Sequence, residues 1–142
     1  MSAKDVYHDT AKHALEKDGW RITHDPYTIP WEKDKKDLFI DLGAEVIAAE
    51  KEAIRIAVEV KSFIGRSEMS ELQKALGQFV IYRFLLERHD PERMLYRAVP
   101  DFILESLFDE PMGQLLMEHE GIKVLGFDID TEEVTKWLPQ RP

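Results

Sequence analysis

Three residues in the middle of the chain have the types and spacing of a metal-assisted hydrolytic site. Glu59 and Lys61 stand two positions apart, and Asp41 precedes them in the stretch DLFIDLGAEVIAAEKEAIRIAVEVKS, residues 37–62. Two carboxylates suit Mg²⁺, a hard cation that prefers oxygen ligands and keeps several waters. Such an ion acidifies a bound water for attack on phosphorus, and a neighbouring lysine orients that water or stabilises the developing charge. The three residues therefore predict a Mg²⁺ or Mn²⁺ site acting on a phosphodiester.

The residues around these three indicate that strands position them. Branched apolar residues alternate with other residues from Ile54 to Lys61, and a similar alternation runs from Asp37 to Leu42. A period of two is typical of strands. Glu59 and Lys61 then project side by side from one face of the second strand, and a hairpin brings Asp41 to them. The alternative is an amphipathic strand whose polar face simply meets solvent.

Hydrophobic periods and turn residues predict a mixed α/β fold, with a mixed central sheet flanked by helices, in one domain covering residues 1–142. The first helix, residues 3–18, ends at Gly19. A strand at 20–23 and an extended connection at 24–30 follow. Gly43 closes the strand 37–42, and the strands 45–50 and 54–61 complete three antiparallel strands. Beyond them we expect a helix at 71–87, a strand at 94–99 in parallel pairing, helices at 100–107 and 111–118, and strands at 123–128 and 134–138.

The helix expected at 71–87 is apolar over much of its circumference, which predicts that it is buried. Gln78 lies within it, four residues before Tyr82 on the same side. We consider two roles for Gln78, satisfying a buried polar group or serving in catalysis. His8, His13 and His24 follow no metal-binding spacing, and we expect them to be surface or half-buried polar residues.

The composition is that of a soluble globular protein. The chain has 142 residues, of which 44% are hydrophobic and 33% charged, and it contains no cysteine. Disulfides and thiol-based sites are therefore excluded, and with no secretory signal or membrane span in view we expect a cytoplasmic protein. The net charge of −9 argues against an indiscriminate nucleic-acid binder. Residues 101–142 hold three Lys or Arg against ten Asp or Glu and so supply −7 of that charge, which leaves the predicted site in a nearly neutral region.

A short basic cluster, Lys33, Lys35 and Lys36, precedes the first of the central strands. It could contact a phosphate backbone. The alternative is a solvated turn, because Glu32, Asp34 and Asp37 are interspersed with the lysines.

The order of elements, with Asp41 and Glu59-Val60-Lys61 on the sheet and a helix directly after, resembles the restriction-endonuclease-like, or PD-(D/E)xK, fold. The whole chain resembles a more specific family, the XisH proteins, or fdxN-element excision controlling factors, of cyanobacteria. The segments that carry this resemblance are AKDVYHDTAKHALEKDGWRITHDP, IDLGAEVIAAEK, IAVEVKSF, ALGQFVIYR and AVP. The motif's proline is missing, because Lys36 and Ile40 directly precede the candidate acids Asp37 and Asp41.

The resemblance implies an accessory factor in programmed DNA rearrangement, acting with a site-specific recombinase and a small protein of the XisI type. Asp41, Glu59, Lys61 and Gln78 match the nuclease site, with Asp41, Glu59 and Val60 as the metal ligands. Three functions compete: a metal-dependent DNA endonuclease, a nuclease-fold protein that binds DNA without cutting it, and a non-catalytic interaction subunit of a DNA-processing complex that docks through its acidic tail. A homodimer is also expected, since twofold dimers are the commonest oligomers.

Overall fold

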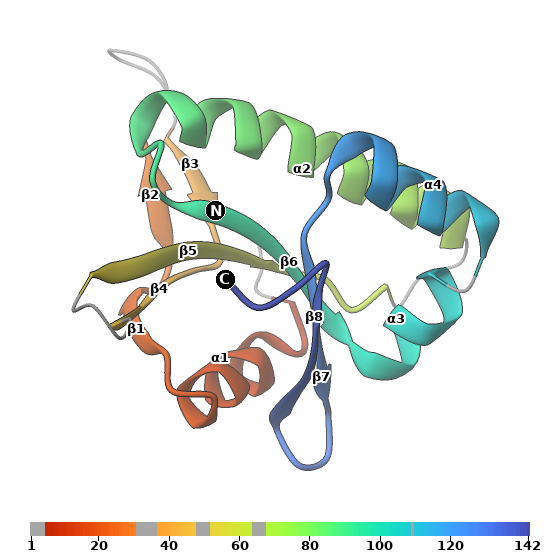
Figure 1. Cartoon of the computed structure of the whole chain (residues 1–142), viewed down its shortest axis with the longest axis horizontal. Helices are drawn as coiled ribbons and strands as arrows, with labels where there is room; N and C mark the ends of the chain where they lie inside the picture. The colour runs from red at the N-terminus through yellow and green to blue at the C-terminus, as the bar shows by residue number, and fades with distance from the viewer. Residues whose placement is uncertain (1–4, 31–36, 48–51, 64–67, 109) are drawn as a thin grey trace.

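A six-stranded mixed sheet forms the centre of the computed structural model, which describes residues 5–30, 37–47, 52–63, 68–108 and 110–142 (Figure 1). The strand order is β1-β4-β5-β6-β7-β8. The elements, in chain order, are α1 (His8–Lys17), β1 (Arg21–His24), β2 (Tyr27–Ile29), β3 (Leu38–Ile40), β4 (Leu42–Ile47), β5 (Ala53–Val60), α2 (Glu68–His89), β6 (Met94–Pro100), α3 (Asp101–Phe108), α4 (Pro111–Glu120), β7 (Val124–Asp128) and β8 (Glu133–Leu138).

The pairing directions divide the sheet into two antiparallel ends and a parallel middle. β4 pairs antiparallel with both β1 and β5, and β7 pairs antiparallel with β8. β5, β6 and β7 run parallel to one another. The parallel step from β5 to β6 is made by the long helix α2, as a crossover requires. The mixed α/β class and the parallel pairing expected after this helix are therefore confirmed.

Helices cover both faces of the sheet, with α1 on one side and α2 on the other (Figure 1). Ala11, Ala14 and Leu15 of α1 pack with Leu42 and Val58 of the sheet. On the opposite face, other residues of the sheet pack against buried apolar residues of α2. Within the described residues, no helix is both long enough and apolar enough to cross a membrane.

Helix α1 ends as the sequence predicts. Gly19 adopts φ +96°, a backbone conformation that side-chain-bearing residues rarely take, and the Trp20 N–H returns to the Leu15 carbonyl at 3.0 Å. The start of the predicted helix is wrong, because α1 begins at His8 and Val6 is exposed ahead of it. The predicted residues up to Lys4 lie outside the described part of the chain.

The central strands break at Asp41 and not at Gly43, so the predicted boundaries there are wrong. Gly43 lies inside β4, where an added Cβ would come within 3.0 Å of His24 Nδ1 and 3.1 Å of Tyr27 Cδ2. Glycine at this position therefore permits close packing. Tyr27 itself begins β2, a strand in the segment expected to be an extended connection, and β2 pairs with β3 in a separate two-stranded sheet.

Helix α2 is longer than predicted and is not buried on all sides. Ala75, Phe79 and Leu86 are buried toward the sheet, whereas Ile81 and Phe84 are 56% and 55% exposed. The apolar residues of α2 thus lie on two sides of the helix. One side packs on the sheet and the other is exposed to solvent, so the predicted burial holds for one side only. The exposed apolar side is available for contact with another molecule.

Candidate active site

Asp41 and Glu59 meet at the junction where β3 gives way to β4. The antiparallel register pairs Leu42 with Val58, which sets the preceding Asp41 opposite Glu59. Their carboxyl groups are close enough to share a hydrogen bond when one of them is protonated. The Asp41 Oδ2 accepts a hydrogen bond of 2.7 Å from the Val60 N–H. The two acids are therefore neighbours at the strand break, and a backbone N–H fixes the Asp41 carboxylate there.

The shared environment of the two acids changes their protonation. Glu59 is only 8% exposed. This burial, together with the hydrogen bond and the negative charge of Asp41, raises the pKa of Glu59 to about 10, although Arg97 opposes the shift. Without a cation, the pair holds a proton at neutral pH.

Lys61 directly follows β5, two residues after Glu59, and its side chain lies on the side of α2, as the alternation predicts. Its Nζ lies 2.7 Å from Glu71 Oε2 on α2. The salt bridge with Lys61 lowers the pKa of Glu71. The structure thus brings Asp41 and Glu59 together, and it holds the Lys61 ammonium against α2 through Glu71.

One stripe of α2 faces the site. Glu71, Ala75, Gln78 and Tyr82 recur at the spacing of a single helix face. Tyr82 lies near Glu59, and burial, followed by the charge of Glu59, raises the pKa of Tyr82 to about 12. Gln78 lies on this stripe with its side chain exposed. Neither role considered for Gln78 is tested by this exposure, so both stay predictions.

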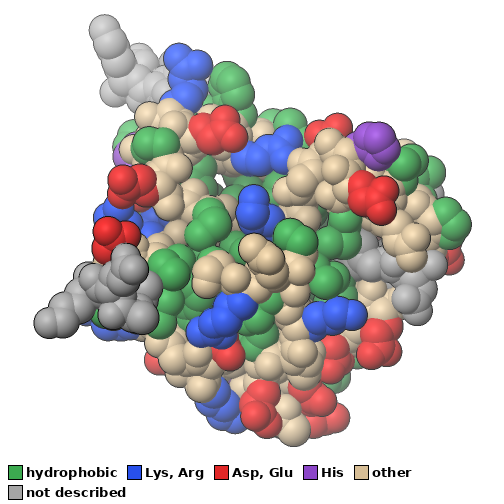
Figure 2. Space-filling view, viewed as in Figure 1, with side chains coloured by type: hydrophobic (Ala, Val, Ile, Leu, Met, Phe, Trp, Pro, Cys, Tyr) green, Lys and Arg blue, Asp and Glu red, His purple; other side chains and the backbone are tan. Residues whose placement is uncertain are grey.

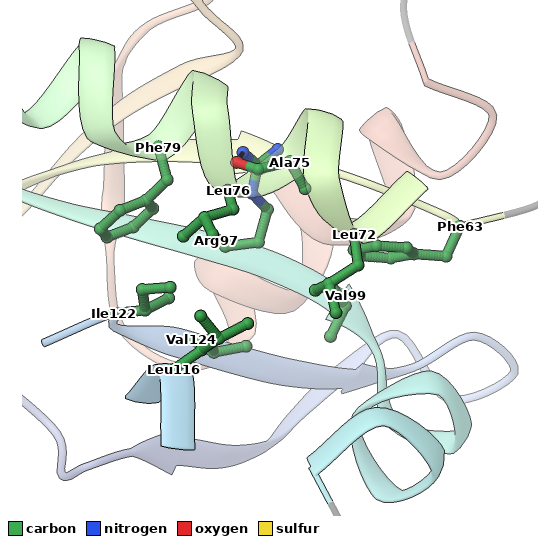
Figure 3. A pocket seen from close by; sticks show the side chains of 10 residues that line it. All are labelled: Phe63, Leu72, Ala75, Leu76, Phe79, Arg97, Val99, Leu116, Ile122 and Val124. Carbon is green, nitrogen blue, oxygen red and sulfur yellow. Dashed lines mark hydrogen bonds between the residues drawn. The ribbon is translucent and has the colours of Figure 1, made fainter. Parts of the chain in front are cut away.

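Arg97 is a site residue that the sequence analysis missed. It lies directly opposite Glu59 in the parallel register of β5 and β6 and is 4% exposed. Figure 3 shows its side chain extending from β6 toward α2 among apolar side chains, where its Nη2 donates to the Ala75 carbonyl at 2.7 Å. Burial lowers the pKa of Arg97, while Glu59 and Asp41 counteract that shift. Arg97 therefore places a buried positive charge next to Glu59, on the neighbouring strand.

His8 is a second residue that the analysis missed, since it was expected near the surface and is 3% exposed. Its Nε2 lies 2.7 Å from Asp25 Oδ1, and Asp25 Oδ2 accepts from Lys12 at 2.9 Å. On the other side of the ring, His8 Nδ1 lies 3.9 Å from Asp41 Oδ1. The signal was present in the sequence, because His8, Ala11 and Leu15 follow the spacing of one buried helix face.

The two carboxylates fit a hard divalent cation. Within the described residues, no three His, Asp or Glu side chains already converge as a complete cation site. Asp41 and Glu59 nevertheless supply oxygen donors from neighbouring strands, and Val60 lies between Glu59 and Lys61 with its N–H on Asp41. A pair of carboxylates with remaining positions left to water is the donor set that Mg²⁺ commonly accepts.

The acidic groups are unevenly distributed over the surface. Figure 2 shows Lys and Arg among hydrophobic side chains across the middle of one face, with a group of Asp and Glu at its lower edge. That edge carries the β7–β8 turn in Figure 1. On this face the Asp and Glu side chains lie toward the edges, around the Lys and Arg side chains of the middle. The basic cluster Lys33, Lys35 and Lys36 lies outside the described residues.

Comparison with known proteins identifies the family of this chain. The family described as XisH protein matches residues 1–135. The chain is 41% identical to an XisH family protein from Nostoc punctiforme PCC 73102, with a TM-score of 0.81 over 94% of this chain and 98% of that one. It is 36% identical to an fdxN element excision controlling factor protein from Anabaena variabilis, with a TM-score of 0.81 over 95% of this chain and 99% of that one. No curated protein matches the sequence. The chain therefore belongs to the XisH family.

Proposed function

We propose that this protein is a divalent-metal-dependent DNA endonuclease of the PD-(D/E)xK type that serves the excision of an inserted DNA element. The observation that carries this proposal is the close approach of the Asp41 and Glu59 carboxyls, with Lys61 two residues after Glu59 on the side of α2. The solved relative from Anabaena variabilis is named for control of fdxN element excision. Removing an inserted element requires DNA strands to be broken and rejoined, so a nuclease site suits that role.

Each residue has a distinct task in the proposed reaction. Mg²⁺ or Mn²⁺, when bound, supplies an acidified water and neutralises charge on the phosphate oxygens. Asp41 and Glu59 bind and orient the cation, and the Val60 backbone fixes the Asp41 carboxylate through its N–H. Lys61 holds its positive charge beside the reacting phosphate and stabilises the charge that develops there.

Helix α2 sets the position of these groups. The Lys61 ammonium is held by Glu71, and Tyr82 lies near Glu59 on the same stripe of the helix. Gln78 lies between Glu71 and Tyr82 along the stripe and is exposed. We assign Gln78 to contact with the DNA substrate or its attacking water, since its amide can both donate and accept hydrogen bonds.

A second candidate function is a non-catalytic interaction subunit of a DNA-processing complex. The observation that favours it is the exposed apolar side of α2, formed by Val80, Ile81 and Phe84. Exposed apolar patches commonly mark protein interfaces. This function agrees with the expected partners, a small XisI-type protein and a site-specific recombinase, and does not need the carboxylate pair to bind metal.

A cleavage assay separates the two functions. Linear, supercoiled and branched DNA are incubated with the protein and Mg²⁺ or Mn²⁺, beside the Glu59→Gln and Lys61→Ala variants. The nuclease predicts metal-dependent cleavage that is lost in both variants. Absence of cleavage of every substrate with either metal, or equal cleavage by the variants, would contradict it and favour the interaction subunit.

A further inference from the structure

His8 presents an unpaired ring nitrogen to the acid pair. The residue is 3% exposed, and its Nδ1 is buried without a hydrogen-bond partner in the described structure. Leaving a buried polar atom unpaired is unfavourable. The atom faces Asp41 Oδ1 across 3.9 Å, which is too long for a hydrogen bond. A group bound between the two atoms would remove that cost.

The contact of His8 with Asp25 determines which nitrogen is available. Asp25 Oδ1 lies 2.7 Å from His8 Nε2, while Asp25 Oδ2 accepts from the Lys12 ammonium. A carboxylate paired with a lysine in this way is an acceptor, so Nε2 is the ring nitrogen that donates to Asp25. Nδ1 is then the nitrogen left to bind an ion on the side of Asp41. Histidines that bind metals have this arrangement, in which a carboxylate accepts from one ring nitrogen and the other binds the ion.

The distance between His8 and Asp41 suits a shared ion. Nitrogen and oxygen donors bind small divalent cations at about 2.1 Å, so two donors of one ion lie at most about 4.2 Å apart. The observed 3.9 Å falls inside that limit, near its upper end. A small movement of the His8 ring or of the Asp41 carboxylate brings both into an ordinary coordination angle. Asp41 is the common neighbour of His8 and Glu59. Because the three side chains do not converge on one point within the described residues, the same movement has to bring them to a shared ion.

We infer that His8 Nδ1 is a ligand of the same divalent cation that Asp41 and Glu59 bind, and that it makes the site select Mn²⁺ over Mg²⁺. The inference rests on the metal site of the proposed function and adds to it a ligand and a metal preference. Imidazole nitrogen suits first-row transition metals, whereas Mg²⁺ prefers oxygen. With two carboxylates alone the site would discriminate little between these ions.

Pulsed EPR of the full-length protein with Mn²⁺ detects a bound imidazole directly, through the magnetic coupling of its nitrogen to the metal. Calorimetry with Mn²⁺ and with Mg²⁺ gives the affinities. The variants are His8→Gln, the double variant Asp41→Asn/Glu59→Gln, and His13→Gln as a matched control. His13 is also on α1, but its side chain is 52% exposed and its Nδ1 lies 3.0 Å from Glu132.

We expect nitrogen coupling in the parent and in His13→Gln and none in His8→Gln. The His8→Gln change should weaken Mn²⁺ binding about tenfold or more and change Mg²⁺ affinity by less than about threefold. One outcome would overturn the role of His8 alone: Mn²⁺ binding that is lost in the double variant, with no nitrogen coupling in the parent spectrum. The proposed metal site would then still stand. Absence of Mn²⁺ binding, or binding unchanged in the double variant, would overturn both. The parent spectrum decides the question even if His8→Gln fails to fold.

Discussion

Arg97 lies directly across from Glu59 in the parallel pairing of β5 and β6, so a buried base and a buried acid occupy one row of the sheet. Asp41, the neighbour of Glu59, extends that row into the neighbouring antiparallel pair. Two acids and one base thus lie side by side beneath α2. The charges of this row are therefore the place to test both the stability of the protein without metal and the proposed cation site.

Replacing Arg97 by methionine should destabilise the protein by about 3 kcal/mol, the cost of leaving a buried charge without its partner. The methionine keeps most of the volume among the apolar neighbours of Arg97 but removes the charge that faces Asp41. The loss should be at least about 1 kcal/mol smaller in an Asp41→Asn background, where that negative charge is gone. Urea unfolding of the two single variants and the double variant measures this coupling. Strictly additive free energies would show that Arg97 acts only through its bond to the Ala75 carbonyl.

The stability of the metal-free protein should depend on pH through Glu59. The folded protein holds the Glu59 proton with a pKa of about 10, whereas the ordinary value is 4.5. Because the unfolded chain releases that proton first, the free energy of unfolding should fall as pH rises from 4.5 toward about 10.

Glu59→Gln removes this dependence, so its melting temperature should exceed that of the parent by a margin that grows between about pH 5 and about pH 9. Thermal melts in a chelating buffer measure the margin. A constant difference between parent and variant over this range would show that Glu59 is ionised in the folded protein.

Lys61→Ala should abolish cleavage while leaving the fold and the cation intact. Lys61 binds neither Asp41 nor Glu59 and contacts Glu71 in a partly exposed salt bridge, which contributes little to stability. We expect cleavage to fall at least about 100-fold, the usual cost of removing one group that stabilises developing charge. Lys74→Ala, which removes an exposed lysine on α2, is the matched control. Equal losses in both variants would point to a general effect of positive charge on DNA binding.

The acidic C-terminal segment gives a prediction about partners. Asp128 Oδ1 accepts the N–H groups of Asp130 and Thr131, so this residue builds the β7–β8 turn and cannot be changed without affecting the fold. Asp130 and Glu133 are exposed and suit charge reversal. Reversing both to lysine should slow association with an XisI-type partner at low salt, since charge complementarity acts mainly on the association rate.

Surface plasmon resonance at two salt concentrations tests this expectation. Glu92→Lys, which loses an exposed contact with Arg55, controls for a charge reversal outside the acidic segment and is compared with each single reversal. An unchanged association rate after reversal of Asp130 and Glu133 would mean that the acidic segment serves solubility and not docking.

The contact between Asp41 and Glu59 could be predicted because it depends on local alternation. If Ile54 to Val60 forms a strand, the alternation determines the sheet face on which the Glu59 side chain lies. The register of the hairpin then sets Asp41 opposite Glu59. The exact break of the preceding strand could not be predicted in the same way. Gly43 looks like a strand end in the sequence, but it lies inside β4 because His24 and Tyr27 approach its Cα closely. That approach is a tertiary contact with no local signal.

The two buried charged neighbours of the site show the other limit. Arg97 stands in the apolar run MLYRAVP, and only the register of β6 against β5 reveals that it faces Glu59. His8 carries a helical signal with Ala11 and Leu15, so its burial could have been predicted. Its closeness to Asp41 could not, since that depends on how α1 docks on the sheet.

Calorimetric titration of the metal-free protein with Mn²⁺ tests most directly whether Asp41 and Glu59 jointly hold a catalytic cation. We expect one saturable site in the parent, the same site in an Asp9→Asn control on the exposed side of α1, and no site in Asp41→Asn/Glu59→Gln. Heats of binding that are the same in the parent and in the double variant would contradict the proposal that these two carboxylates form the metal centre of a nuclease.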